Sequence, residues 1–179
     1  MPTLTYKLHM SDDDIRESWR RMVDEHIAWA YAYHTPADEV DIEAMVEYYN
    51  TEIILPFGFC VDGKLAGFAE VLPYTIQSRA IEVNPCLWRE YFQYGKELFI
   101  GGSLFCLEKL DGACCVGKTP VVNRHMINLL DKIGYQRIGY IPEACWYVRK
   151  NKFVDCVVSV ATRQSLLKAR KRLEQALSA

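Results

Sequence analysis

The amino-acid sequence predicts a single α/β domain built on a mixed β-sheet with helices on both faces. Two β-rich runs flank the dipeptide Asp62-Gly63, which is typical of an antiparallel hairpin with a type I′ turn. Later in the chain, β-like runs alternate with helical patterns, which favours strands connected through helices. Half of the 179 residues are hydrophobic, and this is enough for one core in a chain of this length.

The first elements are predicted to be one strand and two helices. Alternation over residues 3–9 predicts the strand. Ser11 and the three aspartates that follow it predict a helix start, because a hydroxyl caps free N–H groups and acids favour the positive end of the helix dipole. Thr35-Pro36 predicts the start of the second helix. The expected apolar faces are Ile15, Trp19, Met22, Val23, His26, Ile27 and Ala30 in the first helix, and Val40, Ile42, Met45, Val46 and Tyr49 in the second.

The remaining elements follow from the same patterns. Strands are predicted over residues 53–61 and 64–72, and a third over residues 79–83 that ends at Asn84-Pro85. The later elements are a helical pattern over 88–110, a short buried strand over 113–116, a helix over 122–133, strands over 136–141, 145–148 and 153–162, and an amphipathic helix over 165–177. Since no repeat or linker interrupts this order, residues 1–179 are predicted to form one domain that closes with the helix.

Composition excludes several classes of function. The formal net charge is −2, so the chain lacks the excess of basic residues that is typical of a nucleic-acid-binding protein. No apolar run approaches the ~18 residues that a membrane-spanning helix needs, and residues 1–9 lack the regions of a signal peptide. We therefore expect a cytoplasmic protein without a nucleic-acid or membrane partner.

The seven cysteines are interpreted as reduced thiols. Their number is odd, no pair has C-x-x-C spacing, and most stand among apolar residues, where free cysteine packs as a small hydrophobe. No H-E-x-x-H motif is present either. A reducing compartment is expected, and no metal site is predicted.

The most informative stretch of the chain is the segment from Asn123 to Tyr135. Its apolar residues lie on one helical face, Gly134 stands where a left-handed residue would end the helix, and Tyr135 leads into the next strand. This segment resembles the fourth helix of the GNAT acyltransferase superfamily, in which a glycine and an aromatic residue follow the first Asn at the same spacing. Residues 57–70 resemble that family's second and third strands, and residues 153–160 resemble its last long strand.

The resemblance implies where a coenzyme would bind. In this family the fourth strand splays from the fifth, acyl-coenzyme A lies in the gap, and backbone N–H groups at the start of the third helix hold the pyrophosphate. Acetyl-CoA is therefore the expected co-substrate, without a metal. The residues at matching positions are Val83, Gln93, Tyr94, Gly95, Lys96 and Asn123, with Lys96 and Arg89 as charge donors to phosphate.

The resemblance also suggests which groups would move protons. Many family members carry a tyrosine seven residues after the Asn, and Leu130 stands there in this chain. Tyr135, Tyr140 or a water molecule remain as alternatives for the general acid. Glu70 and Glu82 are candidate general bases, because a partly buried carboxylate on a central strand can have a raised pKa. For both glutamates, a solvated or hydrogen-bonded strand residue without a catalytic role stays open.

Two functions of different classes follow. The first is an N-acetyltransferase that moves an acetyl group from acetyl-CoA to an amine of a small molecule or protein by direct attack. The second is a non-catalytic GNAT-like structural or assembly protein in a phage virion or head, whose place would be the virion rather than the cytoplasm. The run Val116-Gly-Lys-Thr-Pro resembles such phage-encoded proteins. A protein partner and a homo-oligomer are open for both.

Overall fold

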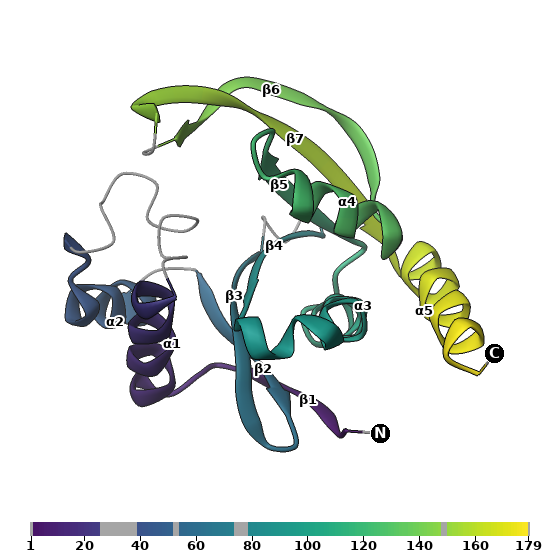
Figure 1. Ribbon diagram of the computed structural model, residues 1–179, viewed down its shortest axis with the longest axis horizontal. Coiled ribbons are helices and arrows are strands. Elements are labelled where there is room, and N and C mark those ends of the chain that lie inside the picture. The colour runs from purple at the N-terminus through teal and green to yellow at the C-terminus, as the bar shows by residue number, and fades with distance from the viewer. Residues whose placement is uncertain (1, 26–38, 52–53, 74–78, 148–149, 179) are drawn as a thin grey trace.

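The computed structural model describes residues 2–25, 39–51, 54–73, 79–147 and 150–178, which form a seven-stranded mixed sheet with helices on both faces (Figure 1). The elements are β1 (Leu4–Leu8), α1 (Asp12–Asp24), α2 (Ile42–Thr51), β2 (Leu55–Val61), β3 (Lys64–Pro73), β4 (Ala80–Leu87), the 3₁₀ helix η3 (Arg89–Tyr94), α3 (Gly95–Lys109), β5 (Cys114–Pro120), α4 (Arg124–Lys132), β6 (Gln136–Tyr147), β7 (Lys152–Thr162) and α5 (Arg163–Leu177). The strand order is β1-β2-β3-β4-β5-β7-β6, and only the β4–β5 pair is parallel. The predicted fold class is confirmed.

Two local predictions at the N-terminal half are confirmed in detail. Ser11 Oγ accepts a hydrogen bond from the Asp14 N–H at 3.2 Å, and the Asp14 carboxylate accepts one from the Ser11 N–H at 3.3 Å, so α1 begins with a capping box. The β2–β3 hairpin turns at Asp62 and Gly63, whose φ angles of 50° and 78° are those of a type I′ turn. The proposed helix start at Thr35-Pro36, together with His26, Ile27 and Ala30, lies outside the described residues.

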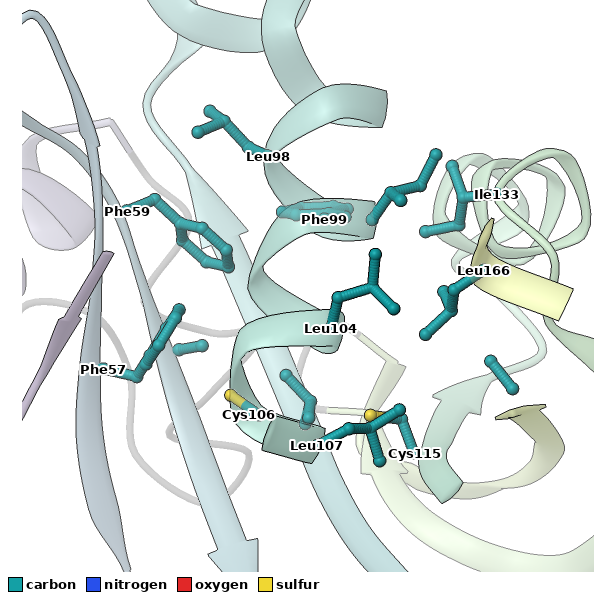
Figure 2. Close-up of a cluster of buried hydrophobic side chains, with 14 of the residues drawn as sticks. Phe57, Phe59, Leu98, Phe99, Leu104, Cys106, Leu107, Cys115, Ile133 and Leu166 are labelled. Atoms are coloured by element: carbon teal, nitrogen blue, oxygen red, sulfur yellow. The ribbon is translucent and has the colours of Figure 1, made fainter. Parts of the chain in front are cut away.

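The core lies on both sides of the sheet. On one face Ile15, Trp19 and Met22 of α1 and Val46 of α2 pack with Phe68 of β3 in a smaller cluster. On the other face α3 is buried on nearly all sides, as its apolar composition requires. Figure 2 shows Phe57 and Phe59 facing α3 from one side, and Ile133 and Leu166 facing it from the other.

Several predicted boundaries were wrong. The strand expected to stop at Asn84-Pro85 continues to Leu87, because β3 pairs with it as far as Gly67↔Leu87. A proline is tolerated there because the ladder to β5 ends at Glu82, which leaves an open edge on that side. β5 likewise continues to Pro120, and the two short strands expected over residues 136–148 are one strand, β6, with an irregular register between Ile141 and Cys145. The helical pattern over residues 88–110 divides into η3 and α3.

The segment from Asn123 to Tyr135 forms the predicted helix and stop. Asn123 caps α4 by accepting a hydrogen bond from the Met126 N–H at 3.2 Å. Gly134 has a φ of 98°, and the Tyr135 N–H donates to the Leu130 carbonyl at 3.0 Å, which is the bond of a Schellman motif. The helix therefore ends at a fixed place, and Tyr135 is turned into the core.

The central feature for function is the divergence of β4 from β5. Residues 80–82 pair with residues 114–116, and there the parallel ladder ends. Beyond this point β4 remains paired with β3, whereas β5 remains paired with β7 as far as Pro120↔Cys156. In Figure 1 the sheet accordingly opens between a β1–β4 half and a β5–β7 half, with α4 beside the opening.

Candidate functional site

A cleft of about 60 Å³ lies where β4 and β5 diverge. Residues 83–85 of β4 form one wall, residues 117–120 of β5 form the other, and Asn123, Met126 and Leu130 approach from α4. Beyond the last ladder pair, the facing strand edges can offer backbone N–H and C=O groups to an extended ligand, as sheet edges do for peptides. This volume is that of a few water molecules.

A second, smaller cavity lies behind the cleft. It shares Val83, Pro85 and Leu130 with the cleft and is lined on its inner side by Tyr135 and Ser103. The Tyr135 and Ser103 hydroxyl oxygens are 3.0 Å apart, and burial raises the pKa of Tyr135 well above its usual value. Tyr135 therefore keeps its proton at neutral pH and lies one layer behind the cleft wall.

Two carboxylates lie on the face of the sheet that α1 and α2 cover. Glu70 of β3 is opposite Asn84 of β4, and Leu72 is opposite Glu82, so these side chains share one face. The Tyr49 hydroxyl of α2 donates to Glu70 Oε1 at 2.5 Å. Burial raises the pKa of Glu70, the bond from Tyr49 opposes that shift, and the nearby Glu82 charge adds to it.

Glu82 marks the closed end of the cleft. Its side chain is only 9% exposed, and its Oε2 lies 2.6 Å from Nζ of Lys118, whose side chain is 39% exposed. The Asn84 amide lies 3.4 Å from the other carboxylate oxygen. A carboxylate, an ammonium and an amide from two diverging strands thus meet where the strands separate.

The resemblance places the pyrophosphate at the start of α3, where it would need backbone N–H groups that are free to donate. In this chain the first of these groups is already bonded. η3 runs directly into α3, and the Gly95 N–H donates to the Phe92 carbonyl. Gln93 and Lys96 are exposed, so Lys96 can offer a positive charge to phosphate. Arg89 is engaged elsewhere, because its backbone N–H and guanidinium both donate to Glu25. The start of α3 therefore offers the Lys96 charge, whereas the Gly95 N–H is already bonded.

The structure brings together part of the predicted site. Val83 and Asn123 line the cleft, and Glu82 lies at its closed end. Glu70 is on the same face of the sheet, whereas Tyr135 lies behind the wall. Tyr94 is half-buried and precedes the buried Gly95 at the start of α3.

Three residues at the site were not predicted from the sequence. Lys118 lies beyond the strand predicted over residues 113–116, so the sequence did not indicate that it would contact Glu82. Asn84 was interpreted as a strand end, and Tyr49 as a core residue. Nothing in the sequence indicates that Tyr49 meets Glu70, because the two residues lie on different elements.

The cysteines, possible metal ligands and helices of the described residues bear on three other classes of site: disulfides, metal centres and membrane spans. All seven cysteines are free, and no group of three or more His, Cys, Asp or Glu in the described residues could hold a metal ion. Cys145 and Cys156 are in contact, with their sulfur atoms 2.7 Å apart. In the described part of the chain, no helix is both long and apolar enough to cross a membrane.

Comparison with known proteins identifies the fold. No family model and no curated protein sequence matches the chain. Among solved structures, Mycobacterium smegmatis RimJ in complex with CoA-disulfide matches with a TM-score of 0.77 at 15% identity, over 97% of this chain and 88% of that one. A chimera of the spermidine N-acetyltransferase SpeG from Vibrio cholerae and hSSAT matches with a TM-score of 0.72 at 16% identity, over 92% of this chain and 98% of that one.

A third similar structure contains the acetyl donor itself. YncA from Salmonella typhimurium, a putative acetyltransferase with its cofactor acetyl-CoA, matches with a TM-score of 0.64 at 12% identity, over 89% of this chain and 94% of that one. At identities this low, the structural matches establish the architecture alone. The diverging β4–β5 pair and the end of α4 at Gly134 agree with the features expected from the family resemblance. The chain has the fold of the GNAT acetyltransferases.

Proposed function

We propose that this protein is an N-acetyltransferase that takes its acetyl group from acetyl-CoA bound between β4 and β5. The observation that carries the proposal is the cleft beyond Glu82 and Val116, with carboxylates at its closed end. Two similar structures hold CoA-disulfide or acetyl-CoA, which supports the same class of donor here. On this proposal the protein works in the cytoplasm on an amine of a small molecule or protein.

The residues of the cleft suggest how the reaction would run. The edges of residues 83–85 and 117–120 would align the thioester arm, and Asn123 could offer its side-chain amide from α4. The acceptor amine would approach from the α1–α2 face and lose a proton to Glu82 or Glu70. The amine then attacks the thioester carbonyl, so that a C–N bond forms and the C–S bond breaks. The attacking nitrogen releases its second proton, which water relays to the departing thiolate.

Leu130 makes water the simplest acid for the leaving thiolate. Leu130 borders both cavities, at the position where the resemblance expects a tyrosine. Tyr135 remains a proposed acid only if the wall between the cavities opens, since its hydroxyl is bonded to Ser103 behind that wall. A rate that is unchanged in Tyr135→Phe would assign the proton to water.

The direct test is acetyl transfer to a panel of primary amines and amino-terminal peptides. Because seven free cysteines would react with thiol reagents, acetylated product should be counted by mass spectrometry. A general base contributes on the order of 10²–10⁴ in rate. Glu82→Gln or Glu70→Gln is therefore expected to lose about 100-fold, whereas Glu108→Gln, an exposed control on α3, should not. Equal activity in all four proteins would refute the assignment of the base.

The second candidate, a non-catalytic assembly protein such as a virion component, is favoured by one observation. The first amide of α3 is already bonded to Phe92, and a phosphate group would need to be held by side chains such as Lys96. Acetyl-CoA at 100 times its dissociation constant should stabilise the fold by about 2.7 kcal/mol if it binds. Lys96→Ala should weaken this effect, and Lys109→Ala, at the far end of α3, should leave it intact. No stabilisation at millimolar acetyl-CoA would favour the assembly protein.

A further inference from the structure

Lys118 occupies an unusual position in the cleft. It lies two residues beyond Val116, the last residue of β5 that pairs with β4, and Val116 is opposite Glu82. Residues two apart on a strand point to the same face, so Lys118 and Glu82 lie on the α1–α2 face. The lysine crosses the opening between the strands and places Nζ 2.6 Å from Glu82 Oε2.

This arrangement puts an amine of the protein where an acceptor amine is expected. Lys118 lines the cleft, and the carboxylate it contacts is one of the two proposed to take the proton from the acceptor. The Glu82 side chain is almost fully buried, and the Asn84 amide lies beside its other oxygen. The carboxylate is thus held in place, while the more exposed lysine retains room to turn toward the cleft.

We propose that Lys118 is acetylated within its own cleft, which makes it a modification site of this protein. The inference rests on the proposed function, because acetyl-CoA must enter between β4 and β5. The Lys118 ammonium gives one proton to Glu82, and the neutral amine attacks the thioester carbonyl. A C–N bond forms and the C–S bond breaks. The nitrogen releases its second proton, which water relays to the coenzyme A thiolate as it leaves.

The reaction has two consequences that can be measured. Acetyl-lysine carries no charge, so the ion pair with Glu82 is lost and the carboxylate becomes available to another amine. A group held beside its reaction partner also reacts as though at very high concentration. The rate of acetylation at Lys118 should therefore level off as acetyl-CoA saturates the cleft and should not depend on protein concentration, whereas the rate at exposed lysines should rise in proportion to the concentration of acetyl-CoA.

The experiment is incubation of the full chain with acetyl-CoA without an added acceptor, followed by peptide mass spectrometry over time. Lys109, Lys168 and Lys171 are exposed and lie outside the proposed binding site, so they report ordinary chemical acetylation in the same sample. We expect Lys118 to be acetylated about tenfold faster or more than these three. Heat-unfolded protein should lose this preference, and Glu82→Gln should bring the rate at Lys118 to that of the exposed lysines.

Binding of acetyl-CoA, measured by thermal shift in the same preparation, separates the two possible failures. If acetyl-CoA stabilises the protein but Lys118 reacts no faster than Lys109, the inference is overturned and the proposed function stands. If acetyl-CoA does not bind, both are overturned. Lys118→Arg keeps a positive charge opposite Glu82 and cannot form this amide, so the fast-reacting signal should be absent from the peptide that contains residue 118, and its persistence would overturn the inference. An equal or faster rate at Lys118 in Glu82→Gln would also overturn the inference.

Discussion

Gly134→Ala tests whether the stop of α4 is fixed by backbone geometry. Gly134 has a φ of 98°, which is uncommon for residues with a side chain. An added Cβ would lie 2.6 Å from the Ser165 carbonyl oxygen and 3.3 Å from the Ala169 Cβ, both on α5. The obstacle at 2.6 Å is backbone, so α5 would have to shift from α4 before the methyl group could fit.

The expected loss of stability follows from these two effects. A left-handed conformation costs roughly 1–2 kcal/mol for a residue with a Cβ, and forcing a methyl group into packed structure costs about 1–3 kcal/mol. The free energy of unfolding should therefore fall by about 2–5 kcal/mol. Gly139→Ala in β6 is the matched control, since its Cβ would meet nothing within 4 Å, and alanine should be neutral or stabilise by up to about 1 kcal/mol.

Equilibrium unfolding in urea provides the measurement for both variants. A fall in the midpoint with an unchanged slope would show lost stability rather than a change in the surface exposed on unfolding. If Gly134→Ala unfolds within about 0.5 kcal/mol of Gly139→Ala, the geometry described for the α4 stop is incorrect.

Two further predictions concern buried polar groups. Tyr135→Phe leaves the Ser103 hydroxyl without its 3.0 Å partner and should lower the free energy of unfolding by about 1–3 kcal/mol in the same urea assay; no loss would contradict that hydrogen bond. Burial raises the pKa of Glu70 above 4.5, so the folded state holds its proton longer than the unfolded state. From pH 4.5 upward, wild type should lose stability relative to Glu70→Gln until the raised pKa is passed, and a relative gain would contradict the assignment.

Local chemistry explains which parts of the fold were predictable. The Ser11 capping box, the Asp62-Gly63 turn and the Gly134 stop each depend on a few neighbouring residues, and all three are confirmed. The ends of β4, β5 and β6 depend instead on partners far along the chain. β4 continues through Asn84-Pro85 because it pairs with β3 there, and this pairing cannot be predicted from the residues near Asn84.

The candidate site divides in the same way. Glu82, Val83 and Asn123 could be placed because a family resemblance fixes their positions along the chain. Lys118 could not be paired with Glu82, because the parallel alignment of β4 and β5 brings them together only in three dimensions. The bond between Tyr49 and Glu70 likewise needs α2 to lie over β3.

Amide hydrogen exchange with and without acetyl-CoA tests whether acetyl-CoA lies between β4 and β5. If it does, the N–H groups of residues 83, 84 and 117–119 should exchange more slowly, with no comparable change at the far end of the β6–β7 pair. Unchanged exchange in both walls of the cleft at saturating acetyl-CoA, or protection confined to another surface, would contradict it.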